Sequence, residues 1–234
     1  MPKTWSYLDF ILVFLGGIVG LSIAAGIGFF IGDDETLLVV LLVGQSVGSL
    51  LVIWLLGRTK DDPDLGFSIA GTDVLFVGAG VLLQVLLSYL LKPLADRLIP
   101  EGEQAQELAE LFAELQSPSV RWAVFFVAVL LAPVTEELMF RGVLLKAIKS
   151  KKTWVVMTIT AVVFAAFHVP DLVGTGFAAR AAVVLPNLLV VGLVLAWVTL
   201  RTKRLGPAIF IHSGYNLLAA VLLLLPREVL ESIS

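Results

Sequence analysis

The sequence predicts an all-α fold, a polytopic bundle of about seven transmembrane helices with one further interfacial helix. The first observation behind this prediction is composition. Of the 234 residues, 59% are hydrophobic and 15% are charged, and the mean hydropathy is +0.99. A single water-soluble core cannot bury that much apolar surface. The second observation is a series of apolar runs of roughly 17 to 25 residues, the length that crosses a hydrocarbon layer.

The apolar runs follow one another with short connections, which predicts one membrane domain over residues 1–234 and no separate soluble domain. In the first run, Gly16 and Gly20 have the spacing that lets two helix backbones approach closely. The predicted spans are 8–32, 36–56, 73–92, 121–147, 153–169, 181–200 and 206–226.

The segment 101–116, between the third and fourth spans, has its apolar residues spaced along one helical face. We expect an interfacial helix here. Its carboxylates disfavour attraction to anionic lipid, so apolar burial would hold it at the surface. Two interpretations stay open for this segment: a solvated connector, or a lid over an outward-facing cavity.

The distribution of basic residues predicts the orientation, because cytoplasmic loops carry the excess of lysine and arginine. Ten of the 16 basic residues fall on one set of alternate loops and five on the other set, and Arg141 lies inside a span. This places the N-terminus in the cytoplasm and the C-terminus outside. We expect a multi-pass protein of a bacterial-type cell membrane. The richer set is Lys3, Arg58, Lys60, Lys146, Lys149, Lys151, Lys152, Arg201, Lys203 and Arg204.

Composition also excludes several kinds of chemistry. The chain has no cysteine, so thiol nucleophiles, disulfides and cysteine-ligated metals are excluded. Its net charge of -3 and scattered basic residues leave no footprint for nucleic acid. Chemistry therefore has to come from carboxylates, histidines and hydroxyls.

The fourth span carries three ionisable residues, which are costly in hydrocarbon unless they are paired or hydrated. Glu137 and Arg141 are four residues apart and share a helix face, so we expect an ion pair. Glu136 points about 100° away and needs a partner on another helix. Pro133 lacks an N–H, which should free the carbonyl of Val129 and favour a kink. A buried ion pair that only fixes packing would explain Glu137 and Arg141, but it leaves Glu136 unexplained.

Both histidines of the chain, His168 and His212, fall in or at predicted spans. His212 and Asn216 share a helix face, which suits two donors directed at a developing oxyanion. If the fourth and fifth spans form a hairpin, Glu136 and His168 lie at nearly the same depth. His212 meets them only if that hairpin extends roughly two turns further into the cytoplasm than the last helix does. This offset also argues against the convergence of all three residues on one zinc ion.

Three motifs in this order on successive helices resemble the CPBP family, which includes type II CAAX prenyl endopeptidases and bacteriocin-immunity-type membrane proteases. They are Glu-Glu-x-x-x-Arg at 136–141, Phe-x-x-x-His at 164–168 and His-x-x-x-Asn at 212–216. The resemblance covers about residues 120–220. It implies a glutamate-dependent intramembrane protease in which Glu136 and His168 activate water and His212 and Asn216 stabilise the oxyanion. Glu137 and Arg141 would be supporting residues.

The sequence thus predicts an endopeptidase that acts on proteins or peptides in or at the lipid bilayer, with a glutamate-activated water and with neither cofactor nor metal. Two other classes stay open. One is a zinc metallopeptidase that uses the same glutamate and histidines, although no His-Glu-x-x-His helix is present. The other is a non-catalytic membrane scaffold or immunity factor. The oligomeric state is not predicted.

Overall fold

The computed structural model describes residues 3–31, 33–99, 115, 117–150, 152–170 and 176–224. Within these ranges the chain forms helices and no strand. Five stretches in the middle of the chain are continuous with one another and form one long helix, Pro118–Ala147. They are α5 (Pro118–Phe126), η2 (Val127–Leu131), α6 (Ala132–Glu137), η3 (Leu138–Leu144) and α7 (Leu145–Ala147). The others are α1 (Tyr7–Ile31), α2 (Asp34–Gly57), η1 (Gly71–Leu75), α3 (Phe76–Leu98), α8 (Thr153–Phe167), α9 (Phe177–Thr202) and α10 (Gly206–Leu224).

These helices confirm the prediction of a helical membrane bundle. Among the described residues, five helices are long and apolar enough to cross a membrane. The helix α8 is shorter, with 15 residues, because it ends at His168. Many large apolar side chains point outward, Phe30 and Leu75 among them, as lipid contact requires. The protein is a multi-pass integral membrane protein. The interfacial helix predicted at 101–116 lies outside the described residues, apart from Leu115.

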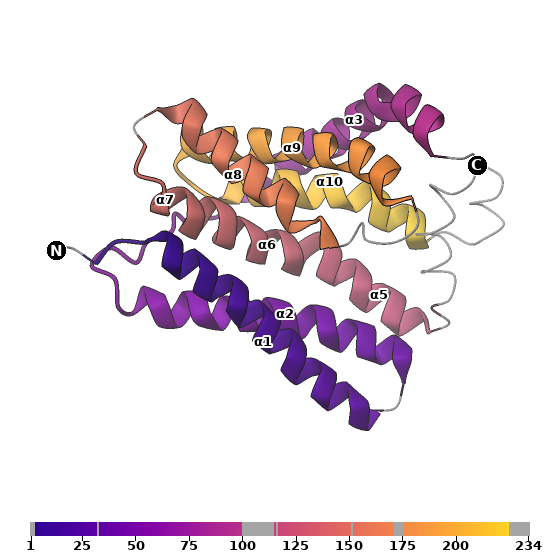
Figure 1. Cartoon of the computed structure of the whole chain (residues 1–234), viewed down its shortest axis with the longest axis horizontal. Helices are drawn as coiled ribbons and strands as arrows, with labels where there is room; N and C mark the ends of the chain where they lie inside the picture. Colours follow the sequence, from indigo (N-terminus) through magenta and orange to yellow (C-terminus); the bar gives the residue numbers. More distant parts are fainter. Residues whose placement is uncertain are drawn as a thin grey trace.

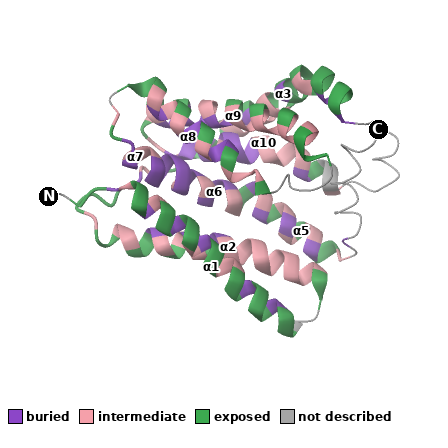
Figure 2. Cartoon of the chain, viewed as in Figure 1, coloured by how far each residue is buried: buried purple, intermediate pink, exposed green. Residues whose placement is uncertain are grey.

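The long helix lies in the middle of the bundle (Figure 1). It contacts α1 and α2 on one side and α8, α9 and α10 on the other. The remaining helices pack mainly in pairs, α1 with α2, α3 with α10, and α8 with α9. Buried residues gather along η3 and α7 and on the facing parts of α9 and α10 (Figure 2). The interior of the protein therefore surrounds the second half of the long helix.

Glycines allow two of the helix pairs to pack with their backbones in contact. In the α1–α2 pair, a Cβ on Gly20 would lie 2.1 Å from the carbonyl oxygen of Gly44, so the close approach predicted for α1 is present. In the α3–α10 pair, a Cβ on Gly80 would lie 2.0 Å from the oxygen of Ile211, and one on Gly214 would lie 2.1 Å from that of Val77. Real Cβ atoms do not approach backbone so closely, so these positions require glycine. The α3 contact fixes α10 on both sides of His212.

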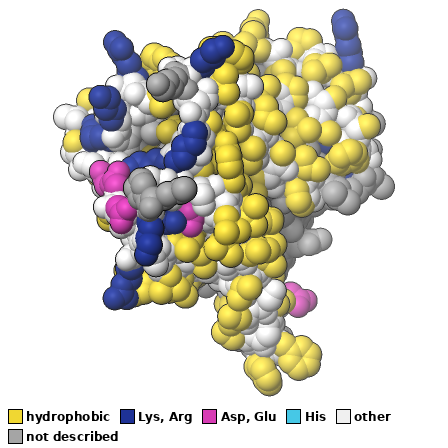
Figure 3. All heavy atoms as spheres, turned by 60° about the vertical axis from the view of Figure 1, so that its left-hand side comes forward, with side chains coloured by type: hydrophobic (Ala, Val, Ile, Leu, Met, Phe, Trp, Pro, Cys, Tyr) yellow, Lys and Arg dark blue, Asp and Glu magenta, His cyan; other side chains and the backbone are white. Residues whose placement is uncertain are grey.

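The loops that carry the ten basic residues of the richer set lie together at the left-hand end of Figure 1. Figure 3 shows basic side chains gathered over this end and hydrophobic side chains covering the flank. The segment between α2 and η1 covers the end of the bundle: the buried Leu65 packs on Gly142, and the N–H of Leu205 donates to the carbonyl of Gly66. Arg204 donates two hydrogen bonds, both 2.9 Å long, to the buried carboxylate of Asp73. These contacts tie the start of α10 to the first part of the chain.

Candidate active site

The long helix departs from α-helical geometry on both sides of Glu136. Residues Val127–Leu131 and Leu138–Leu144 are π-helical, in which a carbonyl pairs with the N–H five residues later. The N–H of Ala132 therefore donates to the oxygen of Val127. The next carbonyl, that of Ala128, would pair with residue 133, a proline without an N–H. The sequence prediction considered only α-helical pairing, in which Pro133 frees the carbonyl of Val129, and so it did not single out Ala128.

The side chain of Asn216 supplies the hydrogen-bond donor that the carbonyl of Ala128 lacks. Its side-chain amide donates a 2.9 Å hydrogen bond to the oxygen of Ala128. The ring nitrogens of His212, one turn earlier on α10, contact Glu137 and Glu136 instead. In this structure His212 and Asn216 therefore lie on one face of α10 and have different hydrogen-bond partners.

Glu137 and Arg141 form the ion pair expected from their spacing. Nη1 of Arg141 lies 2.9 Å from Oε1 of Glu137, and neither side chain is exposed. The guanidinium also donates from Nη2 to the carbonyl oxygen of Gly192 at 3.2 Å and lies 4.5 Å from the ring centre of Phe164. A buried charge needs such partners, because the bilayer interior offers no water to solvate it. The pair thus joins the long helix to α8 and α9.

His212 enters the same network from α10. Its Nδ1 lies 3.0 Å from Oε1 of Glu137, the oxygen that also accepts from Arg141. The imidazole is buried and stands edge-on to the ring of Phe164, with 5.8 Å between the ring centres. Glu137 is therefore a shared acceptor for a guanidinium and an imidazole. Sequence reasoning predicted only the first of these partners.

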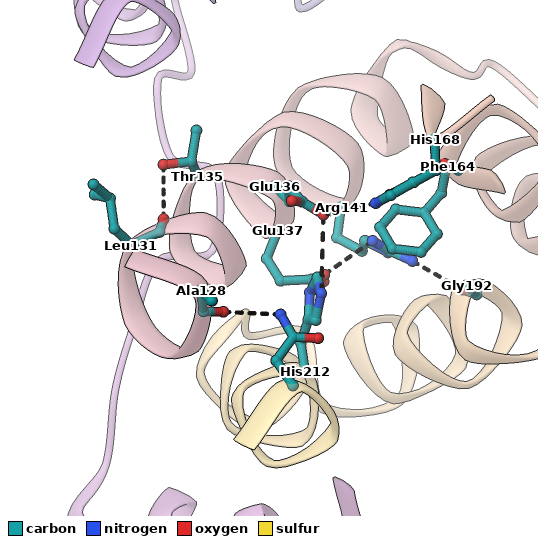
Figure 4. A network of polar contacts seen from close by, with 11 residues as sticks. Ala128, Leu131, Thr135, Glu136, Glu137, Arg141, Phe164, His168, Gly192 and His212 are labelled. Atoms are coloured by element: carbon teal, nitrogen blue, oxygen red, sulfur yellow. Dashed lines mark hydrogen bonds and ion pairs between the residues drawn. The ribbon is translucent and has the colours of Figure 1, made fainter. Parts of the chain in front are cut away.

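Glu136 meets both histidines, as its lack of a partner on its own helix suggested. Its Oε2 lies 4.0 Å from Nε2 of His168 and 3.9 Å from Nε2 of His212 (Figure 4). This oxygen is buried and accepts no hydrogen bond from the described residues. The side chains of Glu136 and His168 are 19% and 24% exposed, whereas that of His212 is 5% exposed. The centre therefore has a closed side at His212 and Glu137 and a more accessible side at His168.

The end of α8 orients His168. The helix stops at this residue, and Nδ1 of His168 lies 2.9 Å from the carbonyl oxygen of Phe164 one turn earlier. The two rings are in contact, with 4.9 Å between their centres. Phe164 thus touches both histidines and Arg141. The motif analysis noted this residue but gave it no role, because a buried phenylalanine in an apolar helix carries no signal of its own.

The convergence of Glu136, His168 and His212 contradicts the doubt raised by the depth count. The long helix continues past Glu136 further than α10 extends before His212, by about five residues or about 7 Å. The expected offset exists, and the three residues meet in spite of it. Tetrahedral zinc ligands stand about 3.4 Å apart, which is closer than the 4.0 and 3.9 Å separations here. Within the described ranges, no three acidic or histidine side chains are arranged to hold a metal.

Comparison with protein families matches residues 118–218 to the type II CAAX prenyl endopeptidase Rce1-like family. This segment is similar to an Rce1-like domain. It contains all the predicted site residues, Glu136, Glu137, Arg141, His168, His212 and Asn216. The family prediction made from the three motifs is confirmed. Comparisons with curated proteins and with solved structures return no match.

The Rce1-like domain indicates an intramembrane endopeptidase. It begins at α5 and ends within α10, so α1, α2 and α3 lie outside the match. These helices supply no predicted catalytic residue, but α3 packs against α10 beside His212. The helix α10, which carries His212 and Asn216, is therefore held in part by a helix outside the matched segment.

Proposed function

We propose that this protein hydrolyses peptide bonds of membrane-associated proteins or peptides with a water molecule activated by Glu136. The observation that carries the proposal is the isolated oxygen Oε2 of Glu136, which faces Nε2 of His168 and of His212 at 4.0 and 3.9 Å. Both separations are too long for direct hydrogen bonds and suit a single water that bridges polar groups. Such a water would lie between these three groups, which reach solvent on the more accessible side of the site, at His168.

The chemistry follows from the groups around this position. Glu136 takes a proton from the water while the water oxygen attacks the peptide carbonyl carbon, with His168 as the second group that holds the water. The carbonyl oxygen becomes an oxyanion, to which we assign His212 and Asn216 as donors. An amide has two N–H groups, so Asn216 keeps one after donating to Ala128. The carbon–nitrogen bond then breaks, and the proton passes from Glu136 to the leaving nitrogen.

Glu137 and Arg141 support this centre without touching the substrate in our proposal. We place the N-terminus in the cytoplasm and the C-terminus outside, in a bacterial-type cell membrane, because ten of the 16 basic residues belong to the lysine-rich set of loops. The substrate is a peptide segment that reaches the site in or at the bilayer. Neither cofactor nor metal is part of the proposal.

The test is peptide hydrolysis by purified protein in reconstituted bilayers, with Glu136→Gln and His168→Ala as variants. We expect both to lose turnover and to keep the melting temperature of the wild type, because apolar packing carries the stability. Asp96→Asn, which alters an exposed carboxylate on α3, is the matched control and should stay active. Turnover by Glu136→Gln at the wild-type rate would refute the role of Glu136 as general base.

The substrates can be sought in parallel by comparing membrane peptides from cells that carry wild-type or Glu136→Gln protein. We expect peptides that are present with the wild type and missing with the variant. An unchanged set of peptides, together with inactive purified protein, would favour a non-catalytic scaffold.

A further inference from the structure

The hydrogen bonds at the far side of each imidazole fix where the protons of the histidines lie. A backbone carbonyl can only accept, so the contact of His168 with the oxygen of Phe164 places a proton on Nδ1 of His168. Oε1 of Glu137 pairs with the Arg141 guanidinium and is therefore the oxygen of a carboxylate, which also can only accept. Its 3.0 Å contact with His212 places a proton on Nδ1 of His212 as well.

We propose that Glu137 is a positioning residue that fixes the ring orientation and the protonated nitrogen of His212, so that Nε2 of His212 faces Glu136. This inference rests on the proposed peptidase function and gives Glu137 a role beyond its ion pair. Arg141 holds the carboxylate in place, because its guanidinium is itself held by the oxygen of Gly192 and the ring of Phe164. Contacts with α8 and α9 thus hold Arg141 and Glu137 on the long helix, and Glu137 in turn holds His212 on α10.

The arrangement also decides what Nε2 of His212 can do. Oε2 of Glu136 and Nε2 of the two histidines surround one position, and a water there has only two hydrogens to donate. The third of these groups has to carry a proton of its own. In the proposal this group is His212, whose Nε2 would then be the donor that an oxyanion requires. Without Glu137, the ring has no acceptor that holds it in this orientation.

The rival interpretation is that Glu137 and Arg141 only stabilise the fold as a buried ion pair. Single substitutions do not distinguish these two interpretations, because removing either Glu137 or Arg141 leaves the charge of the other buried and uncompensated. Removing both charges does separate them, since apolar residues in place of a buried pair are often neutral or stabilising. We therefore compare the wild type with the double variant Glu137→Leu, Arg141→Met.

If Glu137 positions His212, the double variant keeps the melting temperature of the wild type, while kcat falls at least about a hundredfold and KM stays within a factor of about three. If the pair is only structural, the double variant is both folded and active. A folded double variant with wild-type kcat would therefore overturn the proposal.

A spectroscopic measurement tests the proton placement without any substrate. The chain has two histidines, so isotope labelling of the histidine nitrogens gives two imidazole signals by NMR. In the wild type we expect a proton on Nδ1 of both. In the double variant the proton on Nδ1 of His212 should no longer be fixed, while that of His168 stays in place through Phe164 and acts as an internal control. If His212 gives the same signal in both proteins, the proposal fails, whether or not the wild type hydrolyses peptides.

Should the double variant fail to fold, Glu137→Gln provides a second comparison. Arg141 only donates hydrogen bonds, so it should hold the oxygen of the new amide where Oε1 of Glu137 now lies. His212 should then keep its proton on Nδ1. A spectrum of Glu137→Gln in which Nδ1 of His212 has lost its proton contradicts the inference.

Discussion

Alanine in place of Gly214 should impair catalysis through the packing of α10 on α3. A Cβ at this position would lie 2.1 Å from the carbonyl oxygen of Val77, whereas ordinary contact begins at 3.4 Å. The two helices would have to separate locally by about 1.3 Å, the difference between these distances. His212 lies two residues away on the same helix and would move with it. Its 3.0 Å contact with Glu137 would then no longer be a hydrogen bond.

The expected loss of activity is large compared with the loss of stability. A displacement of about 1 Å costs about a hundredfold in rate when catalytic groups are misplaced. Overpacking destabilises by about 1 to 3 kcal/mol, and part of this is offset by the better helix propensity of alanine, about 1 kcal/mol. We expect kcat of Gly214→Ala to fall about a hundredfold at a temperature where the protein is still folded. Peptide hydrolysis in reconstituted bilayers and thermal unfolding measure the two quantities.

Gly78→Ala is the matched control on the partner helix. Gly78 lies in α3, two residues before the tightly packed Gly80, and a Cβ there would meet nothing within 4 Å. This variant should have wild-type kcat and the same or higher melting temperature. If Gly214→Ala were as active as Gly78→Ala, the α3 contact would not position His212, and the reasoning would be refuted.

Two further predictions concern metal and Asn216. Activity should survive exhaustive chelation, and the purified protein should contain no stoichiometric zinc; loss of activity that zinc specifically restores would establish the metallopeptidase instead. Asn216→Ala should lower the free energy of unfolding by about 1 to 3 kcal/mol, because the carbonyl of Ala128 loses its donor. If Asn216 also binds the oxyanion, the same substitution should lower kcat by about 10²-fold or more. Denaturation and steady-state kinetics measure these effects, and reduced stability with unchanged kcat would leave Asn216 with the backbone contact alone.

The main features of the fold and the residues of the site were predictable because membranes impose simple rules. Apolar runs long enough to span predict helices, and ionisable residues inside such runs need partners. This reasoning selected Glu136 and His168 as residues that should meet, and Glu137 and Arg141 as a pair, and all four lie as expected.

Other features depend on contacts that leave no pattern in the sequence. In the π-helical turn the carbonyl of Ala128 faces a proline and accepts from Asn216, and no residue type announces a change from four-residue to five-residue pairing. The contact between His212 and Glu137 joins residues that are 75 positions apart, and only the packing of α10 brings them together. The position of Leu65 on Gly142 likewise comes from a loop with no periodicity.

The contacts of Asp73 with Arg204 and of Gly66 with Leu205 cross the boundary at which the Rce1-like match begins. Residues 118–218, which match the family, thus depend on residues outside the match for part of their packing. A fragment cut at residue 118 would carry all six predicted site residues, yet Arg204 would lose its carboxylate partner and α10 would lose the glycine-lined surface of α3. A substitution in α3 or in the segment between α2 and η1 would therefore alter the position of His212 without changing any residue of the matched segment.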